Sequence, residues 1–292
     1  MTESPISTHA LGKTIGRKTI LRNVSVEVSA GMVVGIIGKN GAGKTTLMDV
    51  LLGFSPASTG NARVFGHDSF TLPAAVKGRI GFVPQQDELV NLLTGRQQLS
   101  LTAALHGRWN QQMIERLRSA WEVPLDQTIQ GLSGGERQKL SILMALGHEP
   151  DLLLLDEPVA SLDPIARRQF LQEMIQIAAG ESRTLLFSTH IVSDLERIAD
   201  QIWIMRDGAI AWAGALDQLK ESVVRLTIAA RQPLPEGFRL PGAISQRVAG
   251  PGASAVVMHW SEAEATRLRQ ELDADIGVES LSLEDIFVEF HA

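Results

Sequence analysis

The 292-residue sequence contains no cysteine and no tyrosine. The absence of cysteine excludes disulfides, thiolate metal sites and a cysteine nucleophile, and it leaves the redox compartment undecided. Aromatic residues amount to only 5%, all of them phenylalanine or tryptophan. Any role that proteins usually give to a tyrosine must therefore be absent here or filled by another residue.

Long apolar runs and excess positive charge are also missing. No 18 consecutive residues are apolar, so no segment is expected to span a membrane alone. Residues 1–18 are polar and lack the apolar core of a secretory signal. The 27 Lys and Arg residues against 33 Asp and Glu residues give a net charge of -6, which disfavours a nucleic-acid partner. The composition, with 44% hydrophobic residues, predicts a folded protein, and the expected lack of a membrane span and of a secretory signal predicts a cytoplasmic one.

Strand-like and helix-like segments alternate through most of the chain. Val24, Val26 and Val28 alternate with polar residues, and residues 32–37 form a continuous apolar run before a glycine-rich loop. A helix is expected over 45–52, and the stretch 94–150 is mostly helical in pattern. Further strands are expected at 79–84, 152–155 and 184–188, helices at 164–179 and 192–199, and a hairpin at 202–213. This order predicts an α/β fold with a parallel sheet.

The composition changes after about residue 221. Residues 223–230 and 253–260 read as strands, and the spacing of Ser261 and Glu264 predicts a capping box at the start of a helix. A last short helix is expected after Ser282. We therefore expect a domain at 1–221, with a helical subdomain at about 86–150, followed by a small α/β appendage at 222–292.

The clearest motif runs from Gly38 to Thr45 (GKNGAGKT) and matches the phosphate-binding P-loop pattern. It follows a buried strand and opens a helix, which is the context that the motif requires. Its glycines let backbone N–H groups converge on phosphate oxygens at a helix N-terminus. We expect Lys44 to reach the β- and γ-phosphates of a nucleotide and Thr45 to offer its hydroxyl to Mg²⁺.

A second motif is a strand of four leucines that ends in two carboxylates, Asp156 and Glu157. The carboxyl edge of a parallel sheet is where α/β folds bind ligands. Asp156 is suited to support Mg²⁺, and Glu157 to polarise a water for attack on the γ-phosphate.

A third motif, residues 132–138 (LSGGERQ), read alone indicates a helix start with Ser133 as its cap. Together with 152–158 (LLLLDEP), however, it resembles the signature of ABC-type ATPases, and the resemblance covers about residues 5–220. It implies a P-loop NTPase fold with an inserted helical subdomain, and it implies that ATP and Mg²⁺ are the cofactors.

The resemblance also implies individual roles. Gln85 resembles the glutamine that senses Mg²⁺ and the attacking water, and His190 resembles the switch histidine at the γ-phosphate. The implied catalytic residues are Glu157, His190, Lys44 and Gln85, and the implied Mg²⁺ ligands are Thr45, Gln85 and Asp156. The implied ATP-binding residues are Ile15, Gly38, Lys39, Asn40, Gly41, Ala42, Gly43, Lys44, Thr45 and Thr46. The residues implied to act on the partner's nucleotide are Ser133, Gly134, Gly135 and Asp163.

The resemblance makes a homodimer part of the mechanism, because each ATP lies between the P-loop of one subunit and Ser133–Gly135 of the other. It further implies a separate multi-pass membrane permease, a position on the inner face of the cell membrane, and no direct contact with cargo. Residues 280–287 (SLSLEDIF) are similar to the ending of ATPases of ABC-2 type exporters, which favours export.

One family residue differs. ABC ATPases commonly stack the adenine on an aromatic residue, usually tyrosine, where this sequence has Ile15. An aliphatic side chain lacks ring-on-ring stacking, which is worth about 0.5–1.5 kcal/mol. We therefore expect a weaker grip on the base with catalysis retained.

Two interpretations from other functional classes remain open. One is a soluble ABC ATPase that acts on nucleic acid or ribosomes, which the negative charge and single cassette disfavour. The other is a regulatory module without hydrolysis, which the presence of Glu157 and His190 disfavours. Outside these motifs, the five tryptophans are expected in cores or on sheet faces, and Arg167 and Arg168 are expected to be solvated.

Overall fold

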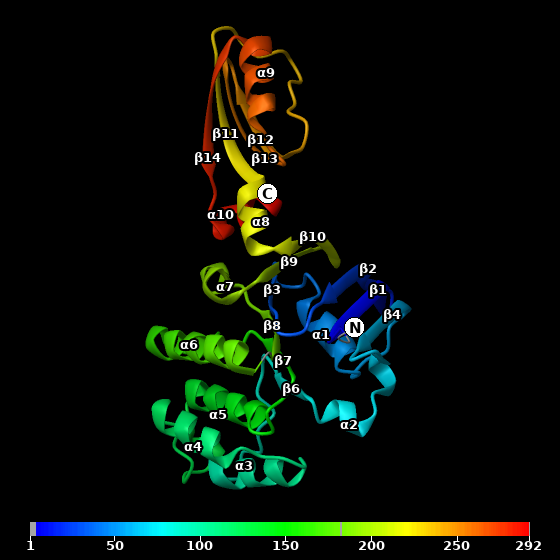
Figure 1. Ribbon diagram of the computed structural model, residues 1–292, viewed down its shortest axis with the longest axis vertical. Helices are drawn as coiled ribbons and strands as arrows, with labels where there is room; N and C mark the ends of the chain where they lie inside the picture. Colours follow the sequence, from blue (N-terminus) through cyan, green and yellow to red (C-terminus); the bar gives the residue numbers. More distant parts are fainter. Residues whose placement is uncertain (1–3, 182, 292) are drawn as a thin grey trace. The chain divides into compact units, whose positions relative to one another are not determined.

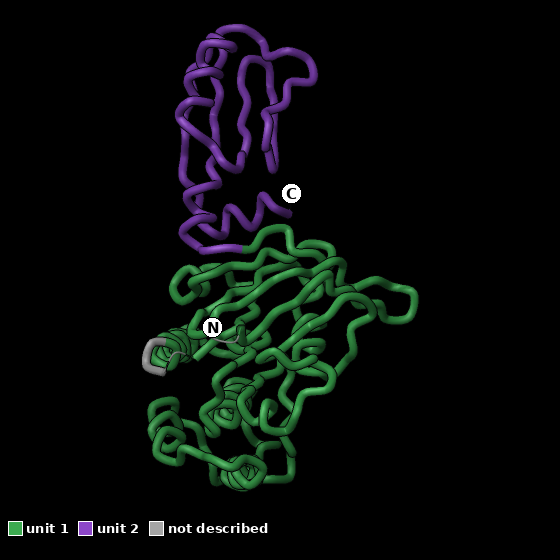
Figure 2. Tube along the Cα trace, turned by 45° about the vertical axis from the view of Figure 1, so that its right-hand side comes forward, with its two compact units in different colours: residues 1–213 green, residues 214–292 purple. Residues whose placement is uncertain are grey.

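The computed structural model describes residues 4–181 and 183–291. The chain divides into two compact units, residues 1–213 and residues 214–292 (Figure 2). Within the described residues, the first unit contains two sheets and the second contains one, and each unit has its own apolar core.

The centre of the first unit is a six-stranded sheet in the order β10-β9-β3-β8-β7-β6. Strands β3, β8 and β7 pair in parallel and are buried along their whole length, as their continuous apolar runs predict. Helix α1 lies on one side of this sheet, and α6 and α7 lie on the other (Figure 1). The elements are β3 (Val33–Ile37), β6 (Ile80–Val83), β7 (Leu152–Asp156), β8 (Thr184–Ser188), β9 (Gln201–Arg206), β10 (Ala209–Ala215), α1 (Lys44–Leu51), α6 (Pro164–Glu181) and α7 (Val192–Ile198).

A second sheet packs beside α1 in the order β2-β1-β4-β5. The expected alternation is confirmed, because Val24, Val26 and Val28 on β2 are all buried. Strand β1 was not expected from the sequence, since its pairing register shifts around Ala10, which has a φ of 46°. Such a bulge breaks the alternation of inward and outward residues that signals a strand. The strands are β1 (Ile6–Ile15), β2 (Lys18–Val28), β4 (Thr59–Val64) and β5 (His67–Asp68).

The stretch 94–150 contains three helices, α3, α4 and α5, which lie together at one end of the first unit (Figure 1). Two of them begin with a capping box, formed by Thr94 with Gln97 and by Ser133 with Glu136. The short helix α2 precedes β6. The helices are α2 (Ala74–Lys77), α3 (Gly95–Ala104), α4 (Gln111–Ala120) and α5 (Gly134–Leu146).

The expectation that Arg167 and Arg168 are both solvated is wrong for Arg167. Its Nη2 donates a 2.7 Å hydrogen bond to Oδ1 of Asp194, a carboxylate that is only 3% exposed. Arg168, the next residue on α6, is exposed. Helix α7 supplies Asp194, so the ion pair depends on a tertiary contact that a charge pattern within α6 cannot indicate.

The second unit is an antiparallel sheet in the order β12-β13-β11-β14, with α9 packed on the face that carries Val224, Leu226 and Ile228. The capping box of Ser261 with Glu264 at the start of α9 is confirmed. Edge strands β12 and β14 were not expected from the sequence. The elements are α8 (Leu216–Ser222), β11 (Val223–Ala230), β12 (Ala243–Ala249), β13 (Gly252–Met258), α9 (Glu262–Leu272), β14 (Ala274–Ser280) and α10 (Leu283–Phe290).

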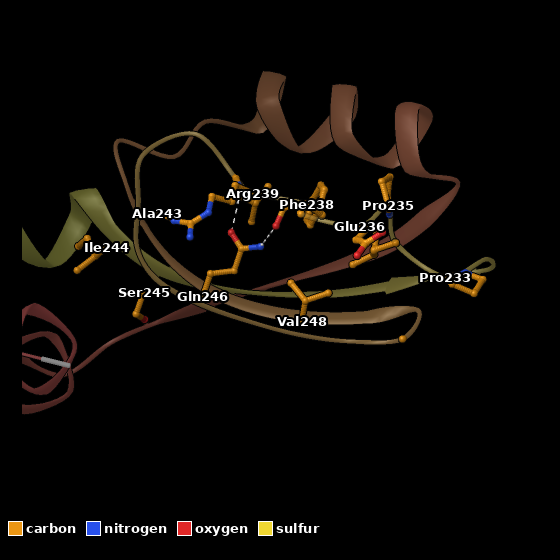
Figure 3. A pocket seen from close by; sticks show the side chains of 14 residues that line it. Pro233, Pro235, Glu236, Phe238, Arg239, Ala243, Ile244, Ser245, Gln246 and Val248 are labelled. Atoms are coloured by element: carbon orange, nitrogen blue, oxygen red, sulfur yellow. Dashed lines mark hydrogen bonds between the residues drawn. The ribbon is translucent and has the colours of Figure 1, made fainter.

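A loop over residues 231–242 runs beside the edge strand β12, and the two enclose a cavity of about 530 Å³ (Figure 3). Gln246 fixes this loop with both ends of its amide. Its Oε1 accepts a 2.9 Å hydrogen bond from the N–H of Leu240, and its Nε2 donates a 2.8 Å bond to the carbonyl of Phe238. The loop therefore covers part of the backbone edge that β12 presents.

Candidate nucleotide-binding and catalytic site

The P-loop lies at the carboxyl end of β3 and leads into α1, as the motif requires. Gly41 and Gly43 have φ angles of 82° and 106°, which residues with a side chain rarely adopt. A Cβ at Gly43 would lie 2.8 Å from Cδ2 of Leu21, so β2 also passes too close for any larger residue. These glycines leave the backbone N–H groups free to converge on an anion at the helix N-terminus.

Lys44 is 7% exposed and folds back over the loop, where its Nζ donates a 2.8 Å hydrogen bond to the carbonyl of Gly38. A pocket of about 380 Å³ opens beside it. Its lining residues come from β2, the P-loop, α1 and the ends of two strands, and they are Lys18, Ile20, Asn40, Gly41, Ala42, Gly43, Lys44, Thr45, Thr46, Gln85 and Glu157.

Glu157 lies at the end of β7 with a φ of 50°, a left-handed conformation that is unfavourable for glutamate. Its backbone N–H is held by Ser188, at 3.1 Å from both the carbonyl oxygen and Oγ. This conformation directs the carboxylate between two functional groups. Oε1 lies 3.5 Å from Nζ of Lys44, and Oε2 lies 2.7 Å from Nδ1 and 3.1 Å from the backbone N of His190.

Asp156, the preceding residue, is 1% exposed. Its Oδ1 accepts a hydrogen bond from Oγ of Ser188, whereas its Oδ2 is buried without a hydrogen-bond partner among the described residues. Leaving a buried acceptor unpaired costs about 1–3 kcal/mol. Burial, followed by the negative charge of Asp156, raises the pKa of Asp49 on α1. A cation bound at Oδ2 of Asp156 would satisfy the unpaired oxygen and would offset the part of the Asp49 shift that comes from the Asp156 charge.

The oxygen donors near the phosphate end fit Mg²⁺. They are the orphaned Oδ2 of Asp156 and the side chains of Thr45 and Gln85, which line the pocket. No group of three or more His, Cys, Asp or Glu residues suited to a metal occurs in the described ranges. This suits Mg²⁺, which takes one or two carboxylates together with water and substrate phosphates.

The residues assigned to the partner's nucleotide lie elsewhere. None of Ser133, Gly134, Gly135 and Asp163 lines the pocket of its own chain. Ser133 engages Glu136 in the capping box, and the bond from the backbone N–H of Ser133 contributes most to lowering the pKa of Glu136. A Cβ on Gly135 would lie 3.3 Å from the carbonyl oxygen of Ser161, so the two segments lie side by side.

Asp163 caps the start of α6. Its Oδ1 accepts hydrogen bonds from the backbone N–H groups of Ile165, at 2.9 Å, and Ala166, at 3.0 Å. These bonds, that of Ala166 above all, hold the pKa of Asp163 below its usual range. The Asp163 carboxylate therefore stabilises the N-terminus of α6, whether or not it also acts at a nucleotide.

Ile15 is 57% exposed at the end of the β1–β2 hairpin and does not line the pocket. Lys18 and Ile20 line it instead, and sequence reasoning missed both. They reach the pocket because the start of β2 crosses the P-loop, where a Cβ on Gly43 would lie 3.3 Å from the carbonyl of Ile20. No local pattern signals this crossing.

The fold and the site together define a P-loop nucleotide-binding protein, with the loop, a basic residue and a carboxylate gathered at the carboxyl edge of a parallel sheet. The family model described as "ABC transporter" matches residues 21–160. The chain is 35% identical over 208 residues to the ABC transporter ATP-binding protein NatA of Bacillus subtilis, covering 69% of this chain and 84% of that protein. It belongs to the ABC transporter ATP-binding proteins, as the motifs predicted, and is an ABC-type ATPase.

Two further similarities extend this finding. The Nod factor export ATP-binding protein I of Paraburkholderia xenovorans is 29% identical over 299 residues, covering 99% of this chain and 97% of that protein. A solved structure described as the ATP-binding subunit of an ABC transporter superposes with a TM-score of 0.68 at 28% identity, covering 75% of this chain and 92% of that chain. The predicted fold class is therefore confirmed. Within the described ranges, no helix combines the length and apolarity needed to cross a membrane.

Proposed function

We propose that two copies of this chain close around two ATP molecules with Mg²⁺, and that hydrolysis reopens the dimer and drives a separate membrane permease. The observation that carries the proposal is the position of the Glu157 carboxylate, 3.5 Å from Nζ of Lys44 and 2.7 Å from Nδ1 of His190. In this proposal the general base Glu157 and the phosphate-binding Lys44 both line the pocket, and His190 is a hydrogen-bond partner of that base.

In this proposal, nucleotide binding replaces the protein partners of the Lys44 ammonium group with phosphate oxygens. Its Nζ now contacts Glu157 and the carbonyl of Gly38, and both side chains of the ion pair are less than a tenth exposed. Phosphate oxygens compete for this ammonium group, so their arrival releases the Glu157 carboxylate. The freed carboxylate accepts a proton from the attacking water, while His190, a hydrogen-bond partner of Glu157, contacts the γ-phosphate.

Asp156, Thr45 and Gln85 would hold Mg²⁺, which neutralises charge on the phosphates and orients them. In this arrangement Gln85 also senses the attacking water. The backbone N–H groups of residues 38–46 bind the phosphates, Asn40 and Lys39 extend this cradle, and Ile15 covers part of the adenine at the hairpin end.

The dimer completes a site that one chain leaves open. Ser133, Gly134 and Gly135 lie outside the pocket of their own chain, at or next to the N-terminus of α5. Exposed N–H groups at a helix start attract anions, so this segment is suited to the γ-phosphate held by a second copy. Residues 161–163, which end in Asp163 and lie beside Gly135, run between the two nucleotide sites of the proposed dimer.

We infer the membrane permease and the direction of transport from the named relatives and from the sequence of residues 280–287. One relative is named for Nod factor export, and residues 280–287 are similar to the ending of ABC-2 type exporter ATPases. We place the protein in the cytoplasm, peripherally on the inner face of the cell membrane, with no nucleic-acid partner. Cargo contacts belong to the permease, which crosses the bilayer.

Steady-state hydrolysis tests the catalytic part. Glu157→Gln keeps the size of the side chain but removes the base, so we expect ATP binding to persist and turnover to become negligible. Glu27→Gln, which changes an exposed carboxylate on β2, is the matched control and should hydrolyse ATP like the parent. Robust turnover by Glu157→Gln contradicts the assigned base.

Purification from detergent-solubilised membranes tests the transport part. We expect the full chain to co-purify with a multi-pass membrane protein. Co-purification with ribosomes or nucleic acid supports instead the soluble translation-type ATPase, and a protein that binds ATP without turnover supports a regulatory module.

A further inference from the structure

The segment that carries Gln85 is held by few interactions of its own side chains. Residues 84–88 follow β6 without regular secondary structure, and Gln85 lines the nucleotide pocket. Asp87 is two residues further on, within about 7 Å of chain. In the part of the chain that the structure describes, Asp87 is the one residue of 84–88 whose side chain forms a hydrogen bond or ion pair.

The partner of Asp87 is Arg137, in the first turns of α5. Nε of Arg137 donates a 2.9 Å hydrogen bond to Oδ2 of Asp87, and Nη2 donates to Oδ1. Such two-pronged pairs fix orientation as well as distance. Both side chains are about four-fifths buried, and the contact lowers the pKa of Asp87 and raises that of Arg137.

The third nitrogen of the guanidinium binds the adjoining chain. Nη1 of Arg137 donates to Oδ1 of Asn91 at 2.8 Å and to the carbonyl of Ile129 at 3.1 Å. The backbone there is also tied, because Gln130 N–H donates to the carbonyl of Asn91 at 3.1 Å. One arginine thus joins the segment after Gln85, the turn before Ser133 and helix α5.

Arg137 is rigidly connected to the residues assigned to the partner's nucleotide. It lies on the same helix start as Gly135, and the backbone N–H of Arg137 donates a 3.0 Å bond to the carbonyl of Ser133. A shift of Asp87 that keeps this pair is therefore transmitted through Arg137 to the start of α5, which carries Ser133 and Gly135. This gives a continuous physical connection between the pocket of one chain and the surface offered to the other.

We propose that Arg137 is a positioning residue that couples occupancy of the chain's own nucleotide pocket to the presentation of Ser133–Gly135 to the second subunit. The proposal rests on the dimer proposed above. Arg137 touches no nucleotide in this scheme and acts through Asp87 and the start of α5. Because coupling free energies are reciprocal, closure of the dimer on Ser133–Gly135 also stabilises Gln85 in its own pocket.

The test uses full-length Glu157→Gln, in which hydrolysis does not intervene, and compares it with the same chain carrying Arg137→Met. ATP binding to the isolated subunit is measured at low protein concentration, and ATP-driven dimerisation by sedimentation velocity. We expect ATP affinity of the subunit to stay within about twofold, while the dimer dissociation constant rises at least about fivefold. Arg137→Lys keeps the positive charge but cannot form a bidentate pair with Asp87. Its dimer dissociation constant should lie between those of the parent and Arg137→Met.

Arg116→Met is the matched control. Arg116 also makes a two-pronged pair, with Glu173 at 2.8 and 3.0 Å, but this pair joins α4 to α6 and touches neither motif. We expect it to leave dimerisation unchanged. If Arg137→Met folds poorly, the isosteric Asp87→Asn removes the same charge pair with less disturbance.

Two results overturn the inference. One is dimerisation of the Arg137→Met and Asp87→Asn chains at the same ATP and protein concentrations as their parent. The other is a loss of subunit ATP affinity by the same factor as the loss of dimerisation, which indicates general damage. If the Glu157→Gln parent itself forms no dimer with ATP, the proposed function fails and this inference fails with it.

Discussion

Acidification should destabilise the first unit through His148, a 3% exposed histidine that follows α5. Its ring stacks on that of His106, with centroids 4.0 Å apart, and its Nε2 lies 3.1 Å from the carbonyl of Ile80. Nδ1 is buried without a partner among the described residues. Burial, followed by the charge of His106, lowers the pKa of His148 to about 4.

The sign and size of the effect follow from this pKa. Above about pH 6.5 the imidazole is neutral in both the folded and the unfolded chain, so His148 contributes no pH dependence. Between about pH 6.5 and about pH 4 the His148 imidazole is protonated in the unfolded chain but stays neutral in the folded chain. The free energy of unfolding therefore decreases as the pH falls. The decrease is about 1.4 kcal/mol per pH unit and about 3 kcal/mol at most.

Urea unfolding at about pH 7.5 and about pH 5, followed by tryptophan fluorescence, measures this loss against His148→Gln. The glutamine amide can still donate to the carbonyl of Ile80 but cannot be protonated. Carboxylates titrate alike in both proteins, so the difference isolates His148. We expect the parent to lose about 2 kcal/mol more than the variant, roughly 1 M in urea midpoint. Equal losses in the two proteins refute the assignment.

Three further predictions follow, two on nucleotide binding and hydrolysis and one on the ion pair of Arg167 with Asp194. Ile15→Tyr should tighten ATP binding about 2- to 10-fold in calorimetric titration, by about 0.5–1.5 kcal/mol of stacking; no change shows that Ile15 does not face the base. Gly135→Ala, whose Cβ would meet the Ser161 carbonyl at 3.3 Å, should slow hydrolysis with ATP binding to the subunit unchanged. Arg167→Met leaves the Asp194 carboxylate buried and unpaired, so the free energy of unfolding should fall by about 2 kcal/mol in thermal melts. Arg168→Met, at an exposed position, should melt like the parent.

The features that sequence reasoning predicted correctly are those encoded locally. The P-loop needs its glycines, Lys44 and a flanking strand and helix, all within about 20 residues, and the structure has the loop between β3 and α1. Helix caps span about four residues: Ser133 was predicted as a cap and Ser261 as part of a capping box, and the structure has a capping box at each. The buried parallel strands β7 and β8 were also predicted, since their apolar runs are continuous.

The features that were missed depend on residues far apart in the chain. The contact of Arg167 with Asp194 joins two helices, and Lys18 and Ile20 enter the pocket because β2 crosses the P-loop. The edge strands β12 and β14 are partly exposed and lack a clean alternation of apolar residues. The expected weaker hold on the adenine stays a prediction, because Ile15 is exposed outside the pocket and has no ring to stack on a base.

Self-association of Glu157→Gln tests the central claim most directly. Sedimentation velocity is run on the purified variant without nucleotide, with ADP and with ATP, and with Lys44→Met added as a control that removes the phosphate-binding ammonium group. We expect monomers in the first two conditions, a dimer with ATP, and no dimer when Lys44 is replaced. A protein that stays monomeric with saturating ATP, or that dimerises equally with ADP, contradicts the claim that two chains close around ATP.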